Sequence, residues 1–266
     1  MPASRRHVRM RMPCPATTAA VIALGVAVMP WKAHASVPTV SGTVFNDLSG
    51  DQSSDGGTDP PLSGWTVNLL DSTNSIVGSF TTGGSGSYSI PLLSPGNYTV
   101  MEVLPAGWVE TLPTGGSYAI PSSTTQDVTD LDFGNFQLVS VSGSIYDDLD
   151  SSGQQNPGEP GLGGRTAEVV DSSNNVVATA NSDVSGNYTV SDVGPGSFTL
   201  HVLSLPGETI TQPTSPDFYS FTSSSGVNVV GGIFGLNGVT PAPEPMSLSV
   251  FGIALIGLKA VRRARR

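Results

Sequence analysis

The chain has 266 residues, of which 32 are glycine and 21 are proline, and it carries a formal net charge of −10. This turn-rich composition argues against long helices, while 38% apolar residues suffice for the cores of two ordinary domains. Arg165 is the one basic residue between positions 36 and 245, where all 21 acidic residues lie, so this central body has a formal charge of −20. Such a body repels phosphate backbones, which excludes a nucleic-acid partner.

The central body also lacks most reactive side chains. The single cysteine, Cys14, lies near the N-terminus, and the body contains no lysine and one histidine, His201. Disulfide frameworks, zinc fingers, thiol nucleophiles, Schiff-base lysines and chemistry that needs two imidazoles are therefore excluded. We expect a protein that is not an enzyme and has no catalytic residues.

The N-terminal segment has the three parts of a secretory signal peptide. Basic residues at 5–11 precede an apolar run at 19–28, and the small residues Ala33 and Ala35 form a cleavage signature. A permanent anchor is the weaker alternative, because ten apolar residues span only about 15 Å of helix. The sequence predicts a signal peptide over residues 1–35 that signal peptidase removes.

The C-terminal segment has the features of a second targeting signal. A Pro-rich linker at 236–245 precedes a mostly apolar stretch and an Arg-rich tail at 246–266, long enough to form a membrane-spanning helix. Four arginines in the last five residues would keep the tail on the cytoplasmic side of the membrane, with the body outside.

The motif Pro243-Glu244-Pro245, followed by the short apolar helix and the terminal arginines, resembles the PEP-CTERM sorting signal of Gram-negative bacteria. That resemblance implies recognition by an exosortase after transient insertion into the inner membrane. It also implies removal of the tail near the motif and transfer of the body to the cell surface or the extracellular matrix. A plain single-pass anchor stays open as the alternative, because the charge pattern alone does not distinguish a processed tail from a permanent one.

The body is a tandem repeat with a shift of 100 to 101 residues. Residues 40–48 (VSGTVFNDL) align with 141–149 (VSGSIYDDL), and 62–77 (LSGWTVNLLDSTNSIV) align with 162–177 (LGGRTAEVVDSSNNVV). Each copy is long enough to hold its own core, which predicts two domains over residues 38–137 and 138–235.

Strands are the expected element throughout both copies. Trp65, Val67 and Leu69 alternate with polar residues, a period of two, and Gly, Pro, Asn, Asp and Ser clusters separate such runs. The pattern predicts an all-β protein of two tandem prealbumin-like or immunoglobulin-like β-sandwiches, with about seven strands each.

The phrases GTVFND, LSGWTV, GSYSI, PGNYTV and DFGNF resemble the SdrD B-like repeat, a relative of the collagen-adhesin B-type domains. The resemblance covers residues 38 to about 235 and implies a stiff, calcium-braced spacer or adhesive module on a cell surface. Some relatives carry a Lys-Asn isopeptide cross-link. That bond is excluded here, because no lysine lies between Lys32 and Lys259.

The second copy contains a loop with the spacing of a calcium-binding loop. Residues 148–159 read DLDSSGQQNPGE, which places acidic or hydroxyl oxygens at alternate positions, a bend glycine at Gly153 and a glutamate at the end. A hard divalent cation takes six to eight oxygen ligands, so we expect a structural Ca²⁺ site. The candidate ligands are Asp148, Asp150, Ser152, Gln154 and Glu159, with Asp147, Asn156 and Asp183 as second-tier donors. Asp183 is equally well explained as a turn residue.

The first copy carries a degraded version of this loop. It has one extra residue, and Gln52 stands where the bend glycine is expected. A weaker calcium site and a solvated acidic loop are both open for it. Its candidate ligands are Asp47, Ser49, Asp51, Asp55 and Asp59.

These features predict a non-enzymatic surface or matrix protein whose calcium-braced sandwiches serve adhesion, biofilm or surface structure. The alternative is a module that binds extracellular polysaccharide or other surface proteins through exposed aromatic and acidic edges. Trp65 shares a strand face with apolar residues and is expected in the core, which leaves Trp108 as the better surface candidate.

Overall fold

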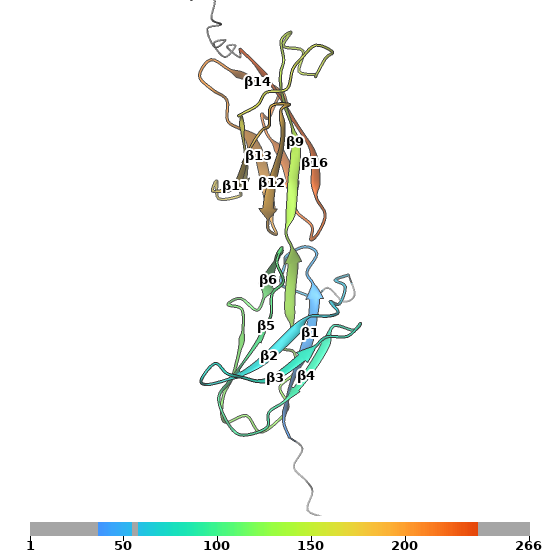
Figure 1. The fold of residues 1–266 in the computed structure, drawn as a ribbon, viewed down its shortest axis with the longest axis vertical. Coiled ribbons are helices and arrows are strands. Elements are labelled where there is room, and N and C mark those ends of the chain that lie inside the picture. The colour runs from blue at the N-terminus through green and yellow to red at the C-terminus, as the bar shows by residue number, and fades with distance from the viewer. Residues whose placement is uncertain (1–36, 55–57, 239–266) are drawn as a thin grey trace, which may run out of the picture. The chain divides into compact units, whose positions relative to one another are not determined.

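A computed structural model describes residues 37–54 and 58–238, which fold into two tandem β-sandwiches (Figure 1). The all-β prediction is confirmed, and every element named in the described part is a strand. The first copy contains β1 (Thr39–Asn46), β2 (Thr66–Asp71), β3 (Ile76–Thr81), β4 (Ser87–Pro91), β5 (Tyr98–Glu102), β6 (Trp108–Leu112), β7 (Tyr118–Ile120) and β8 (Phe133–Gln137). The second contains β9 (Val139–Asp147), β10 (Thr166–Asp171), β11 (Val176–Asn181), β12 (Asn187–Val193), β13 (Ser197–Val202), β14 (Thr209–Gln212), β15 (Tyr219–Thr222) and β16 (Val229–Asn237).

The two copies share one sheet topology. In the first copy the strand orders are β4-β1-β8-β6 and β3-β2-β5-β7. In the second they are β12-β9-β16-β14 and β11-β10-β13-β15, which is the same order strand for strand. The first and last strands of each copy pair in parallel, and the other ladders are antiparallel. Each copy therefore has eight strands, one more than the predicted count of about seven. The prediction was too low because a strand as short as the three-residue β7 shows no readable alternation in the sequence.

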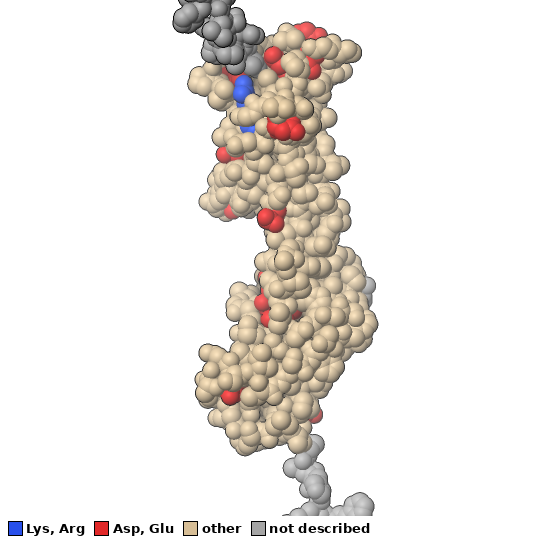
Figure 2. Space-filling model, in the orientation of Figure 1, with Lys and Arg blue, Asp and Glu red and all other residues tan. Residues whose placement is uncertain are grey.

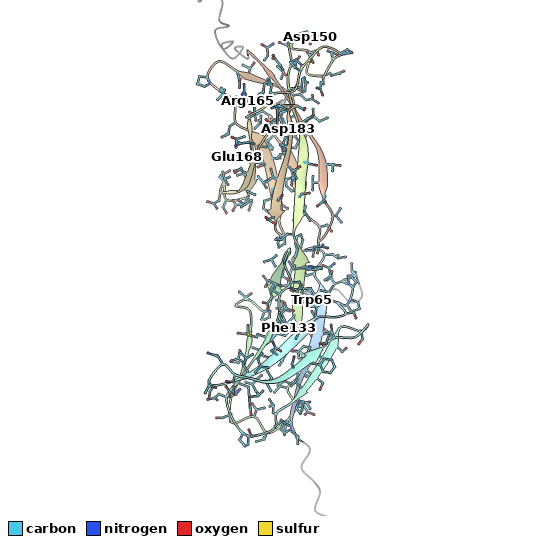
Figure 3. The ribbon with its side chains drawn as sticks, viewed as in Figure 1. Trp65, Phe133, Asp150, Arg165, Glu168 and Asp183 are labelled. Carbon is cyan, nitrogen blue, oxygen red and sulfur yellow. The ribbon has the colours of Figure 1, made fainter. Side chains whose placement is uncertain are left out.

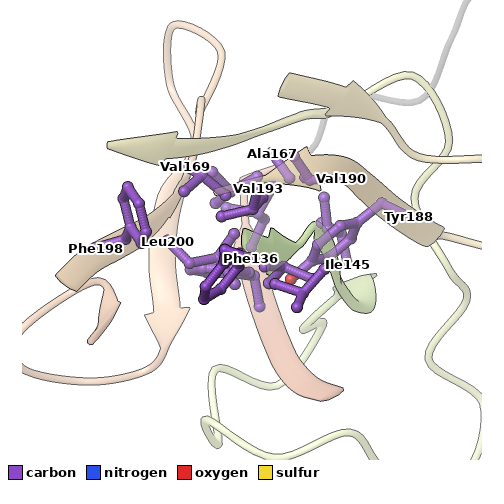
Figure 4. Close-up of a cluster of buried hydrophobic side chains, with 14 residues drawn as sticks. Phe136, Ile145, Ala167, Val169, Tyr188, Val190, Val193, Phe198 and Leu200 are labelled. Carbon is purple, nitrogen blue, oxygen red and sulfur yellow. The ribbon is translucent and has the colours of Figure 1, made fainter. Parts of the chain in front are cut away.

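Alternating apolar residues from both sheets fill each sandwich. Val67, Leu69 and Val100 are fully or almost fully buried in the first copy. Val169, Leu200 and Ile145 are buried in the second, where Figure 4 shows the core side chains drawn together. Their polar sequence neighbours face outward, so the period of two places one face of each strand in the core.

The hairpins that follow β2 and β10 are built by the same turn chemistry. Asp71 accepts hydrogen bonds from the amides of Thr73 (2.8 Å) and Ser75 (3.0 Å). Asp171 accepts them from the amides of Ser173 and Asn175, both at 2.8 Å. These bonds make a local turn favourable and fix the register of the two hairpins.

A buried tyrosine hydroxyl in each copy donates to a backbone carbonyl near or on the last strand. Tyr88 donates to the Leu131 carbonyl (2.5 Å), and Tyr188 donates to the Gly232 carbonyl (2.6 Å). Gly143 permits this close packing, because an added Cβ would lie only 1.8 Å from the Gly232 oxygen. Burial raises the pKa of both tyrosines far above its usual value, so the hydroxyls stay protonated donors.

The predicted signal peptide, the Pro-Glu-Pro motif and the C-terminal helix lie outside the described residues. Within residues 37–54 and 58–238, no helix is long and apolar enough to cross a membrane.

We predict that Tyr188→Phe lowers the free energy of unfolding of the second sandwich by about 1–2 kcal/mol. The substitution keeps the ring but leaves the Gly232 carbonyl buried without its donor. Urea unfolding measures the loss, and Tyr88→Phe should destabilise the first sandwich by a similar amount. An unchanged unfolding midpoint for both variants would contradict this role of the hydroxyls.

Candidate metal centre

Three carboxylates converge in the loop that follows β9. One oxygen from each of Asp148, Asp150 and Glu159 lies within 4.8 Å of the other two. Within residues 37–54 and 58–238, no other group of three His, Cys, Asp or Glu side chains comes this close. Figure 3 labels Asp150 in this loop, at the end of the second sandwich. The spacing that predicted a cation loop therefore does bring its acidic ends together.

Backbone amides of the loop itself hold Asp148. Its Oδ1 accepts the amide of Ser152 (3.0 Å), and its Oδ2 accepts the amide of Gly153 (2.8 Å). Gly153 adopts a φ of 72°, the left-handed conformation that bends the chain back over the carboxylate. The side chain of Asp148 is consequently enclosed by its own loop, with no accessible surface.

The other two carboxylates are fixed in the same way. Asp150 accepts the amide of Ser152 (3.0 Å) and the side-chain amide of Asn156 (3.2 Å). Glu159 closes the loop, because its two oxygens accept the amides of Leu149 (3.0 Å) and Asn156 (2.8 Å). Each carboxylate oxygen has more than one lone-pair direction, so these bonds orient the oxygens and leave capacity to coordinate a cation.

The loop holds its central carboxylate ionised. Burial opposes the charge of Asp148, but the side chain of Thr211 and the amides of Gly153 and Ser152 outweigh it and lower the pKa of Asp148 below its usual value. Asp147 behaves differently, since burial and the neighbouring charges of Glu159 and Glu208 raise its pKa. Asp148 is thus the better ligand for a hard cation, and Asp147 is the poorer one.

The one Lys or Arg side chain among the described residues, Arg165, is already engaged. Arg165 donates through Nη2 to Oε1 of Glu208 at 2.5 Å, and both side chains are largely buried. Figure 2 shows a small blue area on the second sandwich and several separate red patches on the same face. No ion pair between described residues neutralises Asp148, Asp150 or Glu159, so this cluster concentrates negative charge.

Some of the remaining predicted ligands lie in the carboxylate cluster, and others lie outside it. Ser152 lies within the cluster, where its hydroxyl donates to the carbonyl of Gln154 and accepts from Asn156. Asn156 turns its amide nitrogen, rather than its oxygen, toward Asp150. Asp183 is a turn residue: it accepts the amides of Ser185 and Asn187, and the cluster does not include it.

The first-copy loop keeps the frame of the second, but no three of its described carboxylates converge. Asp47 accepts the amides of Gly50 (2.7 Å) and Gln52 (2.9 Å), and Asp59 accepts the amide of Leu48 (3.0 Å). Asp59 therefore occupies the role of Glu159, as the alignment suggests. Ser49 stands where the second copy has Asp150, and Asp55 lies outside the described residues.

Sequence reasoning missed a buried polar contact in the first sandwich. Asn135 on β8 donates to Glu102 on β5 at 3.0 Å, across the two sheets. A signal was present, because alignment of the two copies places Glu102 opposite Val202. The expectation for the aromatic residues holds in part: Trp65 is buried, whereas Trp108 is half-buried, with its ring edge-on to Trp65 at 5.2 Å.

Comparison with known proteins gives one family. The model of the SdrD B-like domain matches residues 39–138 and again residues 139–227. A serine-aspartate repeat-containing protein F of Staphylococcus epidermidis is 27% identical over 189 residues, which cover 67% of this chain and 11% of that protein. A serine-aspartate repeat-containing protein D of Staphylococcus aureus is 28% identical over 162 residues, covering 57% of this chain and 12% of that protein. The chain thus spans about a tenth of these relatives.

Solved structures with partial similarity include two pilins. A minor pilin of Streptococcus agalactiae aligns with 78% of this chain and 99% of its own, at 12% identity and a TM-score of 0.33. A streptococcal ancillary pilin aligns with 77% of this chain and 63% of its own, at 16% identity and a TM-score of 0.36.

The two loops differ at one bend, and this difference is testable. Gln52 has a φ of 69°, close to the 72° of Gly153, although a left-handed conformation is unfavourable for a residue with a Cβ. We predict that Gln52→Gly stabilises the first sandwich by about 1 kcal/mol. Gly153→Ala should destabilise the second sandwich, because its Cβ also approaches the Thr211 carbonyl at 3.1 Å. Chemical denaturation measures both changes. Destabilisation by Gln52→Gly, or stabilisation by Gly153→Ala, would contradict the shared loop frame.

Proposed function

Because the chain belongs to the SdrD B-like domain family, we propose that it is a non-enzymatic module of an exported surface protein, with its two sandwiches acting as spacer or adhesive units. The composition of the body supports this reading. Its one histidine, His201, forms a hydrogen bond through Nε2 with the hydroxyl of Thr199 at 2.8 Å. The convergent carboxylates lie in an end loop, where they accept hydrogen bonds from backbone amides of that loop. A rigid, acidic β module suits display and spacing rather than turnover.

The second sandwich binds calcium in this proposal. The convergence of Asp148, Asp150 and Glu159 within 4.8 Å is the observation that carries it. Three carboxylates at this spacing repel one another, and a divalent cation converts that repulsion into attraction. Ser152 and the carbonyl of Gln154 lie in the same loop and offer neutral oxygens to complete a shell of six to eight ligands.

Calcium would brace the fold because the loop joins two strands of the sandwich. The loop begins at the end of β9, and Asp148 donates its amide to the Leu236 carbonyl of β16 (2.9 Å). Asn237 on β16 also donates to the Asp148 carbonyl (3.0 Å). A cation held by the loop would therefore strengthen the parallel pairing of the first and last strands. No helices flank this loop, so the site is structural rather than a calcium sensor.

The proposed route to the cell surface follows from the targeting signals at the two ends of the chain. The signal peptide directs export through signal peptidase, and the Pro243-Glu244-Pro245 signal hands the chain to an exosortase at the inner membrane of a Gram-negative cell. The body then reaches the cell surface or the extracellular matrix. Polysaccharide binding is the weaker second function, because Trp65 is buried and Trp108 packs against it.

We predict that chelation destabilises the second sandwich by about 1–3 kcal/mol relative to about 10 mM calcium. This range follows from mass action for a module with a dissociation constant of about 10⁻⁴ to 10⁻³ M. Differential scanning calorimetry with EDTA and with excess calcium would show the transition of the second sandwich moving by about 4–8 °C for each kcal/mol.

Paired variants separate calcium binding from folding. Glu159→Gln removes one charge from the cluster and should abolish most of the calcium-induced shift, whatever it does to the calcium-free melting temperature. Glu168→Gln, on β10 and outside the cluster, should leave that shift unchanged. Identical melts with chelator and with calcium would refute the metal site while leaving the family assignment intact.

We also predict that the mature protein lacks its Arg-rich tail. Intact-mass spectrometry of protein recovered from the cell surface should give a C-terminus near Pro243 to Pro245 and an N-terminus near Ser36. Replacement of Glu244 by Gln should leave the tail uncut. Recovery of the wild-type chain ending at Arg266 would favour the plain membrane anchor instead.

A further inference from the structure

The first sandwich contains a polar group that the second replaces with apolar side chains. Glu102 on β5 and Asn135 on β8 are 6% and 0% exposed, and the Asn135 side-chain amide donates to Oε2 of Glu102 at 3.0 Å. Glu110 on β6 is the cross-strand partner of Asn135, so both side chains lie on one face of the sheet. We call Glu102, Glu110 and Asn135 the core triad.

The core triad has more acceptors than donors. Among the described residues, no hydrogen-bond donor reaches Oε1 of Glu102, Oε1 of Glu110 or Oδ1 of Asn135, although all three atoms are buried. An ionised carboxylate only accepts hydrogen bonds, whereas a protonated one supplies an O–H donor. Two ionised glutamates here would leave buried charge and unsatisfied acceptors together, which is strongly unfavourable.

We propose that the core triad is a proton-binding site, in which Glu102 and Glu110 bind hydrogen ions from solvent on folding and release them on unfolding. The bound proton gives the triad the donor that the geometry lacks. It makes the stability of the first sandwich depend on pH, and the second sandwich has no equivalent group. The proposal is independent of calcium binding in the loop at 148–159.

The electrostatics of the triad agree with its geometry. Burial raises the pKa of Glu102 to about 8; the bond from Asn135 opposes this shift and the charge of Glu110 adds to it. Burial also raises the pKa of Glu110, to about 7. The folded state therefore binds protons that an unfolded glutamate, with a pKa of 4.5, has already lost. The stability that the triad contributes is fully present below pH 4.5, falls as the pH rises toward 8, and levels off above it.

Other ionisable groups near the triad do not account for a change in this pH range. Burial raises the pKa of Tyr118 on β7 to about 12 and raises that of Tyr88 on β4 further, so both stay neutral. Asp132, before β8, accepts the amide and hydroxyl of Thr43. Asp47 adjoins the triad through its backbone, because its amide donates to the Asn135 carbonyl at 2.8 Å.

The second sandwich is a natural control within the same chain. The alignment of the two folds places Val202, Ile210 and Leu236 at the positions of Glu102, Glu110 and Asn135. Val202 and Leu236 are buried in the second core, and Ile210 packs against it. The fold therefore accepts an apolar triad at this place, so the polar version is not required by the topology.

Tryptophan fluorescence reports on the first sandwich alone. Trp65 and Trp108 stack edge-to-face there at 5.2 Å, and the second sandwich contains no tryptophan. The experiment is a series of thermal melts of the full chain from pH 5 to pH 8.5, in a Trp31→Phe background that removes the third tryptophan.

We expect the melting temperature of the first sandwich to fall by at least about 4–8 °C across this range, in the wild type and in the charge control Glu168→Gln. Glu102→Gln keeps the shape of the side chain without its proton and should lose at least half of that fall. The triple variant Glu102→Val, Glu110→Ile, Asn135→Leu should lose nearly all of it, and it serves as the test if Glu102→Gln does not fold.

Three outcomes would overturn the proton site. The first is a melting temperature in the wild type that does not change between pH 5 and pH 8.5. The second is a fall that survives unchanged in both triad variants. The third is a fall that disappears with excess calcium and returns with EDTA, because the triad would then hold a metal cation rather than a proton.

Discussion

Negative charge with almost no cationic partner is the constraint that shapes this protein. The body between residues 36 and 245 carries 21 acidic side chains and one arginine, so ion pairing can compensate few of them. Among the described residues, Arg165 forms one ion pair, with Glu208. Every other carboxylate in or near the fold needs backbone amides, water, a proton or a cation from outside. The architecture follows from which of these each carboxylate receives.

Backbone amides are the commonest solution. Asp71, Asp171 and Asp183 each accept two amides of their own turn, so an acidic residue becomes the device that fixes a hairpin. The two end loops extend this device, because Asp47 and Asp148 gather the amides of the residues that wrap around them. Where three such carboxylates meet, at Asp148, Asp150 and Glu159, amides no longer suffice and a calcium ion is the proposed complement.

The two copies divide these solutions between them. The second has the third loop carboxylate at Asp150 and an apolar core beneath the loop. The first has Ser49 in that place and keeps the buried carboxyl of Glu102 beside the half-buried Glu110. One fold thus carries a proposed cation site at its end in one copy and a proposed proton site within it in the other. Duplication allowed the copies to diverge in chemistry without divergence in sheet order.

Local signals made much of this predictable from the sequence. The period-two alternation at Trp65, Val67 and Leu69 gave the strands, and the tandem alignment gave two equivalent sandwiches. The spacing of Asp148, Asp150 and Glu159 predicted their convergence, because a short loop brings alternate residues to one side. The turn role of Asp183 needed the structure, since a turn and a ligand show the same sequence context.

Contacts between distant strands were not predictable in this way. Glu102 and Asn135 are 33 residues apart and meet only because their strands lie in facing sheets. The alternation of Tyr98, Val100 and Glu102 and the alignment of Glu102 with Val202 indicate a buried position, but neither signal names Asn135 as the partner. The count of about seven strands was one too low for a related reason. The strands β7 and β15 are three and four residues long and are defined by their partner strands rather than by their own pattern.

Isothermal titration calorimetry of the intact chain with calcium chloride tests the central claim most directly. The account predicts saturable binding in the range of about 10⁻⁴ to 10⁻³ M that Asp150→Asn weakens strongly, with at least one ion taken up per chain. Absence of any saturable heat at millimolar calcium, or an isotherm that Asp150→Asn leaves unchanged, would contradict it.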